Sequence, residues 1–79
     1  MHRQSDVNQA FWESILRNSK GYQYLHTSDF ISSLVGRGIH FSYSEANRWI
    51  VRYQESFTDR TPEHTENRLW ILKNMGIVR

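Results

Sequence analysis

The chain of 79 residues contains no cysteine and no long apolar run. Without cysteine, neither a disulfide framework nor a thiolate metal site can form. No apolar run approaches the roughly 18 residues of a membrane span. The N-terminal residues MHRQSDVNQ have no apolar segment resembling a signal peptide. These absences favour a soluble, cytoplasmic protein.

Motifs of metal sites and enzymes are also missing. The four histidines, His2, His26, His40 and His64, have no i, i+4 pairing, so zinc-site spacing is absent. The chain has no glycine-rich phosphate loop, no nucleophile elbow and no close carboxylate pair in an apolar stretch. We therefore expect no enzymatic activity, no metal and no small-molecule cofactor.

Charge is mildly basic, with a formal net charge of +2 and a pI near 9.3. Eight of the ten basic residues are arginine, whose planar fork suits phosphates and guanine edges. A codon or lineage bias toward arginine explains this excess equally well. Residues 1–40 hold four basic and three acidic groups, and residues 41–79 hold six and five. Because there is no basic tail, any charged patch must be assembled by folding.

The length predicts a single domain, residues 1–79, with residues 1–4 as a loose tail. A chain this short buries only about 60% of its unfolded surface, so its core must be efficient. Three tryptophans, four tyrosines and four phenylalanines supply the necessary bulk.

The most informative stretch is residues 39–55, IHFSYSEANRWIVRYQE. Ser42 and Glu45 form an S-x-x-E capping box, which predicts a helix over about 42–55. Apolar residues follow at i, i+3, i+4 and i+7 and predict a single buried stripe. The members of this stripe are Ala46, Trp49, Ile50 and Tyr53.

A first helix is predicted from Ser5 or Asp6 to about Asn18, with Gly21 as its stop. Trp12 and Leu16 lie past the edge of its apolar face. We expect the C-terminal segment to cover these two side chains as part of the core. The alternative is that they form a surface for a partner protein.

A strand or extended connector is predicted over residues 22–26, YQYLH, where apolar and polar residues alternate. Thr27 is expected to cap a second helix that ends at Gly36 and Gly38. The predicted buried side of that helix consists of Phe30, Ile31, Leu34 and Val35.

The last third of the chain has two interpretations. In the favoured one, residues 57–60 and 68–72 are the strands of a β-hairpin, with residues 61–67 as its loop. In the other, Thr61 and Pro62 begin a fourth helix that stops at Gly76.

Residues 31–53, ISSLVGRGIHFSYSEANRWIVRY, resemble the paired helices of the winged helix-turn-helix family. The resemblance implies an α+β fold with three helices and a C-terminal hairpin; a fourth helix would instead make an all-α four-helix domain. In style the chain also resembles small accessory proteins of phages, prophages and plasmids.

The resemblance makes the helix at about 42–55 a recognition helix for double-stranded DNA. Base contacts are expected from Ser44, Asn47 and Arg48, with Val51 against a thymine methyl group. Phosphate contacts are expected from Arg37, Tyr43, Arg52 and Arg60. Glu55 lies on the same side and restricts the footprint to the N-terminal half. The hairpin, with Arg60, His64 and Arg68 among three acidic residues, is close to neutral.

The expected function is therefore that of a transcription regulator or a DNA-binding accessory factor. One domain offers few contacts, so specific binding would require a homodimer or repeated sites. The alternative is a non-enzymatic adaptor in which Trp12, Leu16 and the tail bind a host protein or a second copy.

Overall fold

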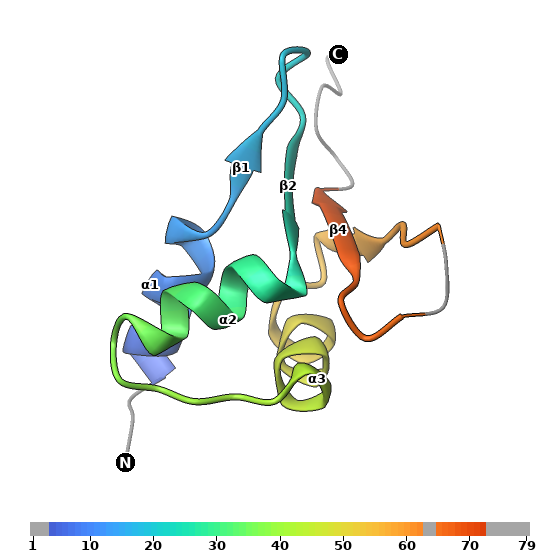
Figure 1. Ribbon diagram of the computed structural model, residues 1–79. Helices are drawn as coiled ribbons and strands as arrows, with labels where there is room; N and C mark the ends of the chain where they lie inside the picture. The colour runs from blue at the N-terminus through green and yellow to red at the C-terminus, as the bar shows by residue number, and fades with distance from the viewer. Residues whose placement is uncertain (1–3, 63–64, 73–79) are drawn as a thin grey trace.

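The computed structural model describes residues 4–62 and 65–72. Within them the chain forms three helices and a four-stranded antiparallel sheet, an α+β fold as expected (Figure 1). The elements in chain order are α1 (Gln4–Glu13), β1 (Leu16–Arg17), β2 (Gln23–His26), α2 (Thr27–Val35), α3 (Tyr43–Tyr53), β3 (Phe57–Asp59) and β4 (Leu69–Leu72).

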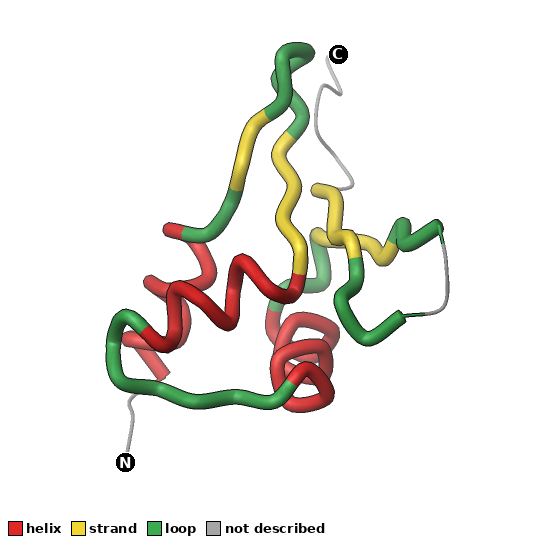
Figure 2. Tube along the Cα trace, viewed as in Figure 1, coloured by secondary structure: helices red, strands yellow, loops and turns green. Residues whose placement is uncertain are grey.

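The sheet joins strands from the two halves of the chain, with strand order β1-β2-β4-β3. Leu25 of β2 pairs with Trp70 of β4, so the N-terminal hairpin and the C-terminal hairpin share one sheet. Figure 2 shows the three helices gathered at one end and the β1–β2 hairpin projecting away from them. The β3–β4 hairpin therefore contributes to the core beside the helices, whereas the β1–β2 hairpin projects away from them.

The predicted C-terminal hairpin is confirmed. Thr58 of β3 pairs with Ile71 of β4, and Phe57 and Trp70 both enter the core. The fourth-helix interpretation is wrong for the described residues, because Thr61 serves the turn instead of a helix start. Its hydroxyl donates to Asp59 and accepts from the Leu69 N–H at 3.0 Å. Gly76, the proposed stop of that helix, lies outside the described residues.

The predicted end of the first helix is wrong, because α1 ends at Glu13 and not at Asn18. Asn18 makes a tight turn instead: its Oδ1 accepts from the N–H groups of Lys20 and Tyr22 at 3.0 and 2.9 Å. Gly21, with φ of +88°, belongs to this turn between β1 and β2. At the other end, Gln4 is already helical, although the sequence placed it in a tail.

The second helix starts one residue away from the prediction. Its N-cap is His26, whose N–H donates to Asp29 Oδ2 at 2.9 Å, and Thr27 is the first helical residue. Val35, expected in the core, is exposed because the helix ends there.

The capping box of α3 is confirmed. Glu45 N–H donates to Ser42 Oγ at 3.1 Å, and Ser42 N–H donates to Glu45 Oε1 at 2.8 Å. The predicted stripe is right for Ala46, Trp49 and Ile50, which are buried. It is wrong for Tyr53, which is 50% exposed on the last turn and only lays its ring against that of Trp49.

Aromatic rings fill the core between the helices and the sheet. Phe11 lies at their centre, with its ring centroid 5.4 Å from Phe30, 5.6 Å from Trp49 and 5.1 Å from Phe57. The contacts of Phe11 with Phe30 and Phe57 are edge-to-face, and such contacts add to the free energy gained from area burial. The core therefore connects α1, α2 and α3 to the C-terminal hairpin.

Candidate nucleic-acid interface

A buried hydroxyl fixes the C-terminal hairpin against α3. Thr27 is fully buried at the start of α2, and its Oγ1 donates to Asn47 Oδ1 of α3 at 2.6 Å. The same oxygen accepts from Trp70 Nε1 and from the Arg68 N–H, both at 3.1 Å. We call these four residues the Thr27 cluster. It joins α2, α3 and β4 at one point.

Asn47 does not play the role expected from the sequence. Besides accepting from Thr27, its Nδ2 donates to the carbonyl oxygen of Glu66 at 2.8 Å. Both ends of the amide are therefore used inside the protein, because Asn47 lies on the side of α3 that faces the hairpin. The base contact expected from Asn47 is therefore corrected: Asn47 positions the loop before β4.

The loop before β4 is also held to α2. Asn67 Oδ1 accepts from the backbone N–H of Ser28 at 2.9 Å, which satisfies a donor in the first turn of that helix. Sequence reasoning missed Thr27 as a long-range contact and missed Asn67 altogether. The only signal was a threonine at a helix start, which reads equally well as a local cap.

The outer face of α3 lies open beside the hairpin. Ser44, Arg48 and Glu55 are exposed, and Val51 is 64% exposed, as the helical periodicity predicts. With Asn47 they form one wall of an open groove. The other wall is made by Phe57, Thr58, Asp59, Thr65, Glu66, Arg68 and Trp70.

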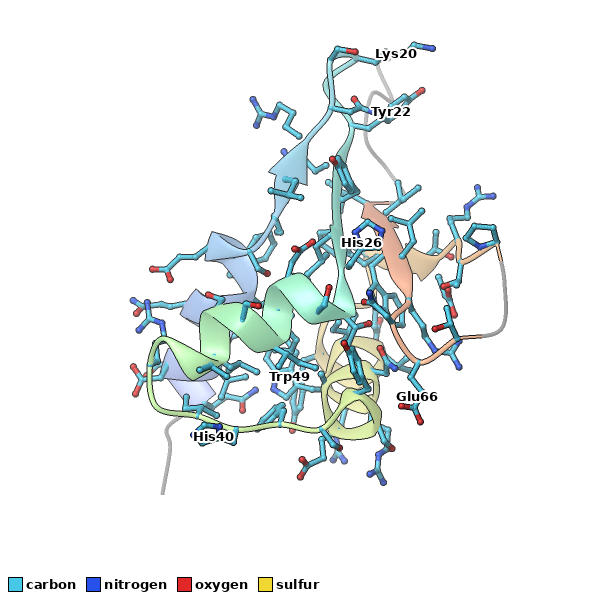
Figure 3. All side chains as sticks on the ribbon, in the orientation of Figure 1. Lys20, Tyr22, His26, His40, Trp49 and Glu66 are labelled. Atoms are coloured by element: carbon cyan, nitrogen blue, oxygen red, sulfur yellow. The ribbon has the colours of Figure 1, made fainter. Side chains whose placement is uncertain are left out.

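The charges of this groove nearly cancel. Arg68 forms an ion pair with Asp59 across the hairpin. The remaining charged residues that line the groove are Arg48, which is positive, and Glu55 and Glu66, which are negative. Figure 3 shows Glu66 directed away from the body of the protein, below the hairpin. The groove is therefore not a strongly positive surface.

Asp59 is held in its ionised form. Burial acts to raise the pKa of its carboxyl, but hydrogen bonds from the Thr61 hydroxyl and N–H and the charge of Arg68 outweigh burial. The net result is a pKa below the ordinary value for aspartate. This carboxylate therefore stabilises the closed end of the β3–β4 hairpin.

The expected phosphate contacts are divided between two places. Tyr43 and Arg52 are exposed on α3, and Arg60 is exposed on the hairpin, where its N–H donates to the Leu69 carbonyl at 2.8 Å. Arg37 lies elsewhere: its Nη2 is 2.7 Å from Glu13 Oε2, and its Nη1 is 3.7 Å from Asp6 Oδ1. It joins α1 to the segment after α2, so it is not part of this face.

Trp12 and Leu16 are not core residues in the described structure. Their exposed fractions are 53% and 43%, and they border one shallow hollow with Ile15, Arg17 and Gln23. The reason is that α1 ends at Glu13, so Leu16 enters an edge strand instead of a helix face.

Within the described part of the chain there is neither a cluster of metal-ligating side chains nor a membrane-spanning helix. Residues 4–62 and 65–72 contain no group of three or more histidine, aspartate or glutamate side chains placed to hold a metal ion. None of the helices in these residues is both long and apolar enough to cross a membrane.

No protein-family model, curated protein or solved structure matches this chain. The function must therefore be argued from the chain's own geometry. The relevant features are the uncovered polar face of α3, the hairpin fixed beside it, and the exposed pair Trp12 and Leu16.

Proposed function

We propose that this protein binds double-stranded DNA through the N-terminal half of α3 and the neighbouring β3–β4 hairpin, as a winged helix-turn-helix domain. The observation that carries the proposal is the uncovered first half of α3, with Ser44 and Arg48 exposed beside a fixed hairpin. The succession of α2, α3 and a hairpin paired to β2 supports the winged form of this motif.

The proposed contacts follow from side-chain chemistry. The Arg48 guanidinium is suited to a guanine edge, and Val51 to a thymine methyl group. Arg52 and Arg60 neutralise phosphates, and Ser44 and Tyr43 donate hydrogen bonds to them. Among the described residues, these three arginines form no ion pair. Asn47 and Arg37 are omitted because their polar groups are used within the fold.

Two acidic residues set the limits of this interface. Glu55 at the end of α3 and Glu66 in the hairpin loop both line the groove and repel phosphate. The DNA contact is therefore confined to residues 43–52 and Arg60. So small a contact gives modest affinity, so specific binding requires a second copy or repeated sites. A cytoplasmic transcription regulator or DNA-binding accessory factor fits this description.

The test compares matched arginine substitutions in a titration with mixed-sequence duplex DNA. Arg48→Ala and Arg52→Ala remove an exposed cation from α3, and Arg17→Ala removes an exposed cation from β1. We expect each α3 variant to weaken duplex binding by about fivefold or more, since a lost contact costs about 1–3 kcal/mol. Arg17→Ala should change it much less. Equal effects of all three substitutions would contradict the proposal.

A second candidate function, that of a protein-interaction adaptor, is favoured by the exposure of Trp12 and Leu16. Tryptophan is a frequent energetic centre of protein interfaces. If this surface binds a second copy, sedimentation should show association that increases with concentration and that Trp12→Ala abolishes. Such association combined with no duplex binding would favour the adaptor.

A further inference from the structure

The β1–β2 hairpin carries two cations and no carboxylate, whereas α3 carries Arg48 and Arg52 together with Glu45. Residues 14–28 contain Arg17 and Lys20 and no aspartate or glutamate. Outside this segment, eight basic residues balance the eight acidic ones. The β1–β2 hairpin projects away from the helices (Figure 1). It is thus a surface distinct from the groove beside α3.

Aromatic side chains alternate along the second strand of this hairpin. Leu25 is fully buried, so its neighbours Tyr24 and His26 face the opposite side of the sheet. Their ring centroids are 6.3 Å apart. Tyr22 lies just before the strand, in the turn closed by Asn18, and is 47% exposed. Figure 3 shows Lys20, Tyr22 and His26 following one another along the hairpin.

The spacing of these rings suits unstacked bases. Residues two apart on a strand are about 6.4–6.8 Å from one another. Successive bases in a duplex strand rise by only about 3.4 Å, so neighbouring rings cannot each meet a successive base of a duplex. An extended single strand separates its bases further and can place one on each ring. Stacking on aromatic rings also accepts any base, since every base has a π face.

We propose that the outer face of β2, with the tip of the β1–β2 hairpin, binds single-stranded nucleic acid. Bases stack on Tyr22 and Tyr24, and Lys20 pairs with a phosphate. No acidic residue within the hairpin opposes a phosphate, and Asp29 lies beyond the His26 end of the strand, where its carboxylate accepts from the His26 N–H at 2.9 Å. A second copy is a poor occupant, because it would bring Arg17 and Lys20 toward the same cations.

The test is a fluorescence anisotropy titration of the full chain with a labelled oligothymidylate single strand. The key variants are Tyr22→Ala, which changes an exposed side chain, and Tyr22→Ala with Tyr24→Ala. Tyr53→Ala is the matched control, since Tyr53 on α3 is 50% exposed and lies outside this surface. Tyr22→Phe retains the ring and removes only the hydroxyl. Circular dichroism establishes that each variant folds.

Loss of one ring should weaken single-strand binding by about fivefold to 150-fold, and loss of both by more. Tyr22→Phe and Tyr53→Ala should bind within about twofold of the parent chain. Lys20→Gln should lower the salt dependence by about one phosphate contact. The proposal is overturned if Tyr22→Ala binds like the parent chain, if Tyr53→Ala weakens binding equally, or if the parent chain does not bind the single strand.

The outcomes separate this site from the proposed duplex interface. Single-strand binding that survives Arg48→Ala but not Tyr22→Ala supports the hairpin site whatever the duplex titration shows. Duplex binding lost with Arg48→Ala, in a chain that ignores the single strand, overturns the hairpin site alone.

Discussion

The two hairpins of this sheet differ in how they are held and in what they carry. The β3–β4 hairpin is joined to α2 and α3 by the Thr27 cluster, and Phe57 packs against Phe11 in the core. The β1–β2 hairpin is closed by its own Asn18 turn and projects from the helices. The β3–β4 hairpin contains the ion pair between Asp59 and Arg68, whereas the β1–β2 hairpin carries two cations and no carboxylate.

The hairpin that is fixed against the helices is therefore not the hairpin that carries cations without carboxylates. In the DNA-binding proposal, the β3–β4 hairpin is a fixed wall beside α3. Arg60 of this hairpin adds one cation to the DNA-binding surface. The β1–β2 hairpin carries Arg17 and Lys20 and no carboxylate, which suits the single strand proposed to bind there.

The largest expected effect separates the two hairpins by their role in the core. Phe57→Ala should lower the free energy of unfolding by about 3–5 kcal/mol, because it removes a buried ring beside Phe11. Tyr22→Ala, which changes an exposed ring, should stay within about 0.5 kcal/mol. Urea unfolding of both variants provides the comparison. Similar losses in both would break the distinction between the hairpins.

The next effect concerns the attachment of the β3–β4 hairpin to α3. Thr27→Val should lower the free energy of unfolding by about 1–3 kcal/mol, since it leaves Asn47 Oδ1 and Trp70 Nε1 without their hydroxyl partner. Thr58→Val on β3 is the control, because that side chain is only half-buried, and it should change stability by less than about 0.5 kcal/mol. If Thr27→Val is as stable as the parent chain, the cluster does not hold the hairpin.

The smallest effect is the pH dependence supplied by Asp59. Because its pKa is lowered in the folded state, the ionised carboxylate stabilises the fold above the unfolded-state pKa of about 4. That contribution is lost as the pH falls from about 4 through the lowered pKa. Asp59→Asn should therefore be less stable than the parent chain at pH 7, and the difference should shrink in acid.

Thermal unfolding of the two chains between pH 7 and pH 3 measures this difference. A gap that stays constant over the whole range would show that Asp59 acts only through its shape. A gap that widens in acid would contradict the lowered pKa.

Local signals were enough to predict much of this fold. The S-x-x-E box at Ser42 and Glu45 predicted the start of α3, because both partners lie within one turn. Alternation in residues 57–60 and the compact apolar run in residues 68–72 predicted the C-terminal hairpin. The outward direction of Arg48 and Val51 followed from helical periodicity alone.

What the sequence could not show depends on residues far apart in the chain. Thr27 meets Asn47 across 20 positions and Trp70 across 43, and neither separation leaves a periodic pattern. Asn47 was therefore interpreted as a base contact when its amide holds the hairpin loop. The end of α1 was missed because Asn18 and Gly21 read equally well as a helix end or as a hairpin turn.

The measurement that tests the central claim most directly is a titration with mixed-sequence duplex DNA at a low and a moderate salt concentration. With Arg52 and Arg60 each neutralising one phosphate, log K should fall with log salt at a slope of about −2. Arg48→Ala together with Arg52→Ala should reduce both the affinity and that slope. No binding at low salt, or binding that the double substitution leaves unchanged, would contradict the assignment of α3 as the DNA-binding helix.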